Sequence, residues 1–163
     1  MALRKILMQG DSALEKKCRA VEKFDQRLHT LLDDMRETLE KSGGVGLAAP
    51  QVGILRRVVI VLDENEAMLE LVNPKIIRQE GEQDGFEGCL SVPGMYGKVL
   101  RPSFVTVQAQ DRNGNSFEVP GEEMVARCFC HELEHLDGHL FVEHTDRLYT
   151  AEELDEIMTE GEK

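Results

Sequence analysis

Two histidines and a glutamate in the last quarter of the chain have the spacing of a metal site. The segment His131-Glu132-Leu133-Glu134-His135 places two imidazoles four residues apart. On a helix this is about one turn, so both imidazoles can reach the same ion. Glu132 lies about 100° around the helix from His131 at 3.6 residues per turn. It can therefore move protons to and from a water on that ion without being a ligand, and the motif predicts a metal-dependent hydrolase.

The sequence offers several candidates for a third ligand, which a catalytic ion of this kind normally requires. The metzincin pattern has a third histidine six residues after the second, but Phe141 stands there. Glu152 or Glu153 would serve a zinc peptidase that uses a downstream glutamate, and Cys89 is the remaining choice. A lone cysteine is more often a small buried hydrophobic residue. Spacing alone leaves these alternatives open.

Composition limits the classes of protein to which the chain can belong. Its 163 residues suit a single domain, residues 1–163, and no apolar run approaches the length of a membrane span. The first residues, MALRKILMQGD, lack the features of a signal peptide, so we expect a cytoplasmic protein with no membrane partner. A net charge of −12 argues against a polyanion as the main ligand, and we expect no specific nucleic-acid partner.

Four cysteines in a chain without a secretion signal are not expected to form a disulfide framework. They are expected to be core residues, metal ligands or reactive thiols. A non-catalytic metal-binding protein is a further alternative, with a closed four-ligand site that includes Cys128 or Cys130.

The hydrophobic pattern predicts an α+β fold: short, mostly antiparallel sheets around a central metal-binding helix, with an N-terminal helix and a short C-terminal helix. The expected helices span residues 25–42, 122–136 and 151–158, the last with a Thr150–Glu153 capping box. Met124 is expected on the same helix stripe as the two histidines. The expected strands span residues 57–62, 69–72, 104–109 and 116–119, with Asn73-Pro74 ending the second and a hairpin turn over 111–115. Residues 43–51 predict backbone that bends sharply or closely approaches another group, and no helix or strand is predicted for the glycine- and acid-rich stretch before Cys89.

Three separated segments together resemble the peptide deformylase family. They are Gly44-Val45-Gly46-Leu47-Ala48-Ala49-Pro50-Gln51, Glu87-Gly88-Cys89-Leu90-Ser91 and His131-Glu132-Leu133-Glu134-His135. They occur in the family's order and at its usual separations, and the resemblance covers nearly the whole chain.

The resemblance implies removal of the formyl group from formylmethionine at the start of nascent polypeptides. It implies metal ligation by Cys89, His131 and His135, with Glu132 as general base and acid. It also implies that the Gln51 side chain and the Leu90 N–H stabilise the oxyanion. Backbone around three residues is expected to line the substrate cleft and pair with the peptide as an added strand: Val45, Gly46 and Gly88.

The implied cofactor is one divalent ion per chain. A thiolate and two imidazoles suit a transition metal and do not suit Mg²⁺ or Ca²⁺. The resemblance favours Fe²⁺ in the cell, with Zn²⁺ or Ni²⁺ in purified protein. The expected partners are N-formylated nascent peptides with transient ribosome proximity, and we expect a monomer.

Three residues near the histidines depart from the family's usual pattern. Glu134 replaces an aspartate and could pair with Arg101, while Cys130 replaces a glutamine and cannot make an amide's hydrogen bonds. Arg127 falls where an apolar residue often lines the methionine pocket. It could shrink that pocket or bind an acidic substrate group, or it could point to solvent with its stem on the pocket wall.

The end of the chain also departs from some relatives, in which a basic helical tail helps docking on the ribosome. Residues 151–163 contain six acidic residues and one lysine. Ribosomal RNA should repel such a helix, so we predict that this tail does not anchor the enzyme by charge.

Overall fold

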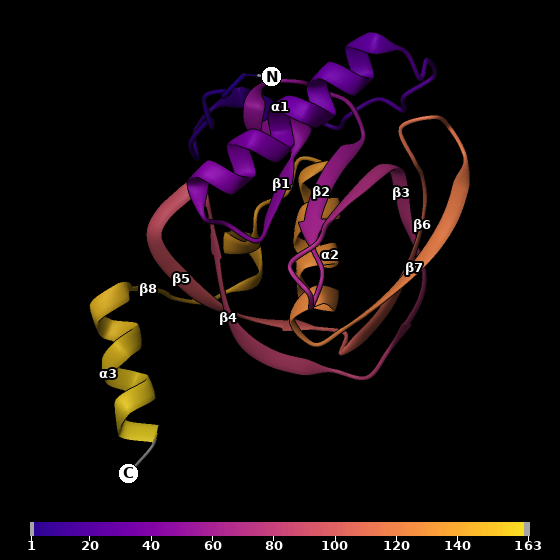
Figure 1. Ribbon diagram of the computed structural model, residues 1–163. Coiled ribbons are helices and arrows are strands. Elements are labelled where there is room, and N and C mark those ends of the chain that lie inside the picture. Colours follow the sequence, from indigo (N-terminus) through magenta and orange to yellow (C-terminus); the bar gives the residue numbers. More distant parts are fainter. Residues whose placement is uncertain (1, 162–163) are drawn as a thin grey trace.

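Two antiparallel sheets lie around one central helix, α2, in the computed structural model, which describes residues 2–161 (Figure 1). The larger sheet has the order β1-β2-β3-β6-β7 and the smaller has the order β4-β5-β8. The strands are β1 (Gly46–Ala48), β2 (Val58–Leu62), β3 (Met68–Glu80), β4 (Gln83–Cys89), β5 (Val92–Arg101), β6 (Phe104–Gln110), β7 (Ser116–Glu122) and β8 (Leu148–Thr150). The α-helices are α1 (Gln26–Ser42), α2 (Met124–His135) and α3 (Ala151–Gly161), and short 3₁₀ helices cover Ser12–Glu15, Ala49–Val52 and Phe141–His144. These elements confirm the predicted α+β class.

Helix α1 begins and ends close to the predicted residues because both of its caps are local. The Asp25 carboxylate accepts the Leu28 N–H at 3.3 Å, which satisfies one of the free amides of the first turn. Gly43 adopts the left-handed conformation at φ 73° and donates its N–H to Leu39 O. The leucines of the predicted stripe are buried against β1 and β2 in one of the core clusters.

Helix α2 is buried on nearly all sides, because it packs against the large sheet and carries the site on its other face. Ala126, Phe129 and Leu133 join the core cluster formed by residues of β1, β2, β3 and β6. Met124 is the exception to this burial: it is the first residue of the helix and is 62% exposed. It lines the pocket described below together with His131, which agrees with the prediction that the two share one stripe.

The prediction that Asn73-Pro74 ends a strand is wrong, because β3 continues to Glu80. A shift of register between Val72 and Lys75 absorbs the proline, which has no N–H to give to the ladder. Asn73 has φ 51°, and its side chain bonds both the N–H and the C=O of Val21, at 2.7 and 2.9 Å. The irregular residue thus ties the N-terminal segment to the sheet.

The glycine- and acid-rich stretch before Cys89, for which the sequence predicts no strand, forms strand β4 paired with β5. Its polar sequence has no alternation of apolar residues that would reveal a strand. A Cβ at Gly88 would lie 2.7 Å from the Tyr96 ring. The lack of a side chain there permits close packing, not only a turn.

Helix α3 projects from the rest of the molecule (Figure 1). The predicted capping box is confirmed, with Thr150 and Glu153 each accepting the other's N–H at 3.2 Å. The apolar side expected to be formed by Leu154, Ile157 and Met158 stays largely open, with Met158 53% exposed. Glu162 and Lys163, counted in the predicted acidic tail, lie outside the described residues. Within residues 2–161, no helix is long and apolar enough to span a membrane.

Replacement of Gly138 by alanine is expected to destabilise the end of α2 severely. Gly138 has φ +83°, and a Cβ there would lie 2.6 Å from the carbonyl oxygen of Glu15, a backbone atom that cannot rotate away. Gly43 is the matched control, since it has φ +73° and open space around the missing Cβ. Urea unfolding should give a loss of about 1–2 kcal/mol for Gly43→Ala and about 2–5 kcal/mol for Gly138→Ala. Equal losses would contradict the role of the Glu15 contact.

Candidate metal centre

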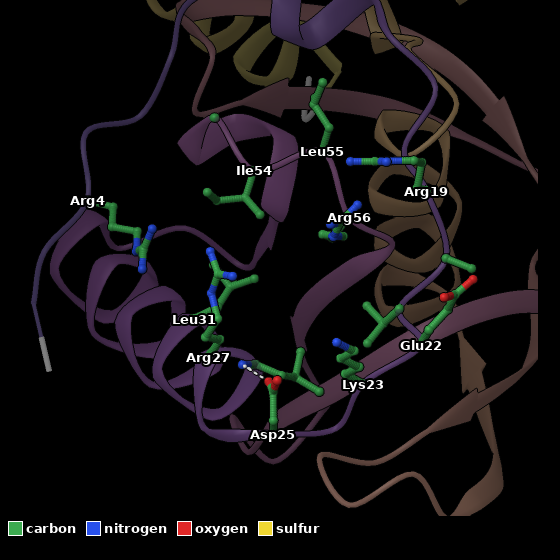
Figure 2. A pocket seen from close by; sticks show the side chains of 14 residues that line it. Arg4, Arg19, Glu22, Lys23, Asp25, Arg27, Leu31, Ile54, Leu55 and Arg56 are labelled. Carbon is green, nitrogen blue, oxygen red and sulfur yellow. Dashed lines mark hydrogen bonds between the residues drawn. The ribbon is translucent and has the colours of Figure 1, made fainter.

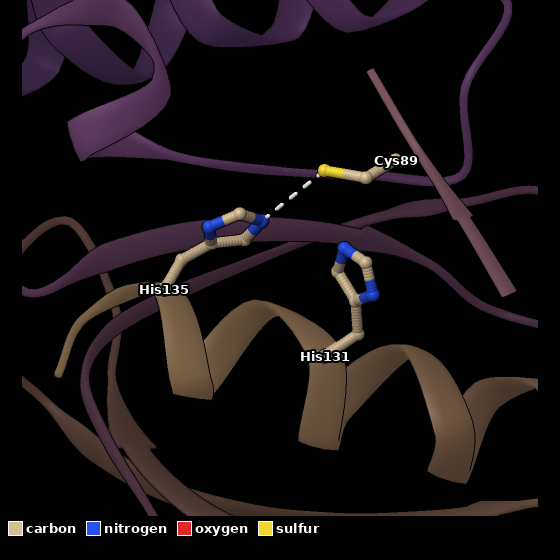
Figure 3. A group of neighbouring side chains, drawn as sticks. All are labelled: Cys89, His131 and His135. Carbon is tan, nitrogen blue, oxygen red and sulfur yellow. Dashed lines mark hydrogen bonds between the residues drawn. The ribbon is translucent and has the colours of Figure 1, made fainter. Parts of the chain in front are cut away.

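Three side chains converge at one point between α2 and the end of β4 (Figure 3). The ligand atoms of Cys89, His131 and His135 all lie within 4.8 Å of one another. His131 and His135 come from successive turns of α2, and Cys89 comes from the tight turn where it faces Val92 across the β4–β5 pair. The structure therefore brings together the predicted triplet.

The donor atoms of this triplet fit a divalent transition metal. The Cys89 sulfur lies 3.5 Å from His135 Nε2, and His135 Nδ1 is buried with no hydrogen-bond partner in the described part of the chain. Burial and the neighbouring His131 lower the pKa of His135 to about 3, so its imidazole is neutral and has a lone pair to donate. One sulfur and two nitrogens around a partly open pocket are the donor set of a catalytic site with a free coordination position.

His131 is oriented by Glu87, a residue that sequence reasoning used only as part of a motif. His131 Nδ1 lies 2.9 Å from Glu87 Oε1, which leaves Nε2 for a metal. Burial alone would raise the pKa of Glu87, but hydrogen bonds from Arg101 and His131 outweigh it and lower the pKa to about 2. The ionised carboxylate therefore fixes which imidazole nitrogen carries the proton.

Two arginines neutralise Glu87. Arg101 donates to both carboxylate oxygens, at 2.7 and 3.0 Å, and Arg127 donates to Oε2 at 2.8 Å. The Arg127 side chain is only 6% exposed, and it also donates to Val99 O at 2.8 Å. The alternative in which Arg127 points to solvent is therefore wrong.

The other two unusual residues differ in their surroundings. Glu134 pairs with Arg101, as expected for a carboxylate one bond longer than aspartate, and also contacts His144. Cys130 is buried, and desolvation raises the pKa of its thiol. It forms no side-chain hydrogen bond with any residue between 2 and 161, so the amide contacts of a glutamine are not replaced.

Glu132 lies next to the triplet without being part of it. Its Oε2 is 4.0 Å from His131 Nε2, and its Oε1 is buried with no partner among residues 2–161. Burial raises the pKa of Glu132 to about 7, with a further rise from the Glu87 charge. A Cβ at Gly46 would lie 2.5 Å from Glu132 Oε2, so only glycine lets the β1 backbone approach the carboxylate this closely. A carboxyl group with a pKa near neutrality can both accept and return a proton.

The Gln51 amide is fixed beside the cysteine. Its Oε1 accepts the Ala48 N–H at 2.9 Å, and its Nε2 donates to Ser91 Oγ at 3.0 Å and lies 3.6 Å from Cys89 Sγ. The 3₁₀ helix Ala49–Val52 carries Gln51 and has Ala48 as its N-cap, so the glycine-rich segment folds back on itself. The amide N–H group is therefore held at the edge of the site.

A cavity of about 420 Å³ opens over these groups. His135 is 1% exposed and is not among the residues that line this pocket. Sequence reasoning missed Phe86, Pro93 and Tyr96, which lie in segments without a motif. The predicted residues that line the pocket are Val45, Gly46, Gln51, Gly88, Cys89, Leu90, Arg127, His131 and Glu132.

Comparison with known proteins identifies the class to which this fold and site belong. A model of the family described as polypeptide deformylase matches residues 3–151. A peptide deformylase of Caldicellulosiruptor bescii is 52% identical over the whole chain and 98% of its own length, and one of Agathobacter rectalis is 53% identical over 88% of this chain and 90% of its own length. The crystal structure of a peptide deformylase from Legionella pneumophila has a TM-score of 0.84 and 40% identity, covering 99% of both chains.

The chain belongs to the polypeptide deformylase family. It is a metal-dependent hydrolase that removes the N-formyl group from nascent polypeptides. The alternative of a zinc peptidase with a downstream glutamate finds no support. Neither Glu152 nor Glu153 joins the triplet within the described chain, and Glu153, on the projecting helix α3, pairs with Arg147 instead. The closed site with Cys128 or Cys130 is not formed there either.

Replacement of Glu87 by glutamine is expected to destabilise the metal-free protein by about 3–5 kcal/mol, because it leaves two buried guanidinium groups without their shared countercharge. Asp84→Asn on the same strand is the matched control, since the Asp84–Lys98 pair is half exposed, with side chains 50% and 57% accessible. Its loss should be below about 1 kcal/mol. Urea unfolding with a chelator present measures both values, and a Glu87→Gln loss as small as that of Asp84→Asn would contradict the role of the buried carboxylate.

Proposed function

We propose that Cys89, His131 and His135 hold one divalent ion and that the pocket above it binds the formylated end of a polypeptide. The observation that carries this proposal is the meeting of three donor atoms within 4.8 Å, beside a buried carboxylate with a free oxygen. When bound, such an ion acts as a Lewis acid that activates water and polarises a carbonyl group. The remaining chemistry is assigned to side chains and backbone of this chain.

Glu132 is proposed to transfer the protons of the reaction. Its unpartnered Oε1 can accept a proton from the attacking water, and its pKa of about 7 allows it to return that proton to the amine nitrogen as the C–N bond breaks. Formate and a free N-terminal amine are the products. Closure of the site by the substrate would exclude bulk water from this exchange.

Gln51 and the backbone N–H of Leu90 are proposed to stabilise the oxygen of the formyl group as it gains negative charge. The hydrogen bonds of Gln51 Oε1 to Ala48 and of Nε2 to Ser91 hold this amide in place before substrate arrives. A donor that needs no reorganisation contributes about 3–4 kcal/mol to transition-state stability.

Val45, Gly46 and Gly88 are proposed to bind the peptide backbone. They lie on or beside β1 and β4, which are edge strands of the two sheets, and all three line the pocket. An edge strand offers unpaired N–H and C=O groups, so an extended peptide can pair with it as an additional strand. Val45 is 51% exposed and thus accessible to such a partner.

The thiolate and two imidazoles suit a divalent transition metal. The family relationship favours Fe²⁺ in the cell as the proposed metal, with Zn²⁺ or Ni²⁺ possible in purified protein. We propose that residues 1–163 act as one catalytic domain, because every group invoked above lies within them. The protein is further proposed to act as a monomer in the cytoplasm. The substrates emerge from ribosomes, which implies transient proximity to them. The acidic α3 is proposed not to provide a charge-based anchor.

Arg127 is proposed to close one end of the substrate pocket. Its guanidinium is within the pocket lining but is already neutralised by Glu87 and bonded to Val99 O. A negatively charged substrate group would therefore compete with Glu87 for it. Arg127 then acts mainly by limiting the length and apolar character of the pocket.

The first prediction for this mechanism concerns formate release from formyl-Met-Ala-Ser by metal-loaded protein. Glu132→Gln should bind metal normally and lower kcat by about 100- to 10,000-fold, because the proton acceptor is lost. Cys89→Ala should lose both metal content and activity. Cys130→Ala is the matched control, since it removes a buried thiol of α2 that lies outside the triplet, and it should retain metal. The absence of formate with the loaded wild type would overturn the proposal.

The second prediction concerns side-chain preference. Arg127→Ile should raise the ratio of kcat/KM for formyl-Met-Ala over formyl-Glu-Ala about tenfold. An apolar pocket end stabilises the bound methionine side chain by about the free energy that one methylene group contributes in a hydrophobic pocket. Loss of the Glu87 contact lowers both values together and cancels in the ratio. An unchanged ratio would remove Arg127 from the groups that set specificity.

A further inference from the structure

A second and larger cavity, of about 870 Å³, lies away from the catalytic pocket (Figure 2). It is enclosed by the N-terminal segment, the first turns of α1 and the loop that follows the 3₁₀ helix Ala49–Val52. None of its lining residues lines the catalytic pocket. Its five basic residues are Arg4, Arg19, Lys23, Arg27 and Arg56, against the two acidic residues Glu22 and Asp25. In a chain with 31 acidic and only 19 basic residues, this reverses the overall balance.

Most of these positive charges are not neutralised. Arg4 pairs with Asp34 at 2.8 Å, but the other four basic residues of the cavity form no ion pair with residues 2–161. Asp25 is occupied as the N-cap of α1, through its bond to the Leu28 N–H. The cavity therefore has an excess of positive charge that the described protein does not balance.

Arg19 and Arg56 are held side by side by the backbone. They form an isolated parallel bridge, with Arg19 N–H donating to Leu55 O at 3.1 Å and Arg57 N–H donating to Arg19 O at 3.0 Å. Figure 2 shows the guanidinium groups of Arg19, Arg27 and Arg56 coming from separate elements toward the same space. Guanidinium groups in this arrangement match the oxygens of a phosphate group.

The cavity also has an apolar wall. Leu28 and Leu31 of α1 and Ile54 and Leu55 of the loop all line it. A site for inorganic phosphate alone would not need such a surface. Cationic groups beside aliphatic side chains suit a ligand that joins a phosphate to a flat apolar body.

We propose that this cavity binds a nucleotide, with its phosphate on Arg19, Arg27 and Arg56 and its base against the aliphatic wall. The shared chemistry is that of a nucleoside phosphate, which can be free in solution or be one unit of an RNA strand. The net charge of −12 disfavours a large polyanionic footprint, and the local excess of positive charge confines binding to this cavity. The proposal is independent of the catalytic assignment.

The test uses fluorescence anisotropy of a short labelled single-stranded RNA with the full-length, metal-loaded protein. Arg27→Gln/Arg56→Gln should weaken binding about tenfold and reduce the slope of log affinity against log salt by about 0.7, since both arginines contact the same phosphate and each phosphate contact on a single strand contributes about 0.7. Lys41→Gln/Lys75→Gln is the matched control. It removes the same charge from two exposed lysines outside the cavity and should bind RNA as the wild type does.

Competition distinguishes the two sources of nucleotide. Displacement of the RNA by AMP, but not by equal inorganic phosphate, would assign the cavity to a single nucleotide. Displacement by unlabelled RNA alone would assign it to a nucleotide within a strand. The proposal is overturned if the wild type binds neither the RNA nor AMP, if both double variants lose affinity equally, or if inorganic phosphate competes as well as AMP. Formate release should be unchanged in both double variants.

Discussion

The buried carboxylate of Glu87 is the interaction on which the rest of the site depends. It connects β4 to α2 through His131, to β5 through Arg101, and to the pocket wall through Arg127. A lone buried charge would be very costly, so this carboxylate requires its partners, and they in turn require it. The same contact that joins the small sheet to the central helix also selects the imidazole nitrogen that faces the metal position. Fold stability and ligand geometry are therefore set by one group.

The two sheets contribute different parts of the site around this contact. The large sheet holds α2 in the core and supplies the β1 backbone beside Glu132, while the small sheet supplies Cys89 and the opposite wall of the pocket. Glycine allows the backbone to approach where a side chain would collide, at Gly46 against Glu132 and at Gly88 against Tyr96. The longer side chain of Glu134 is accommodated by an ion pair, since Arg101 bridges it to Glu87. Two of the three departures from the family's usual residues, Arg127 and Glu134, thus belong to one connected set of charges around Glu87, while Cys130 stays outside it.

Much of the structure could be predicted where local chemistry decides it. Caps at Asp25 and Gly43 fix α1, and the i, i+4 spacing places His131 and His135 together. The prediction failed where distant contacts override local preference. Asn73-Pro74 looked like a strand end, but Val21 stabilises a bulge there. Strand β4 lacked alternation because Gly85, Glu87 and Gly88 pack against or bond residues of the site. The part that Arg127 plays could not be derived from spacing, since its partner Glu87 is 40 residues away in sequence. The net charge of the whole chain could not predict the basic cavity, because it sums the charges of surfaces that contact ligands separately.

The free edges of β1 and β4 have a consequence for how widely the enzyme can act. Main-chain N–H and C=O groups are the same in every polypeptide, so recognition through a strand edge is indifferent to the residues that follow the first. In the proposed mode of binding, discrimination is left to the formyl group and to the one side chain that would enter the pocket. An enzyme built in this way can process the products of thousands of different genes with a single site. Such an enzyme selects the N-terminus of a polypeptide and not the amino-acid sequence that follows it.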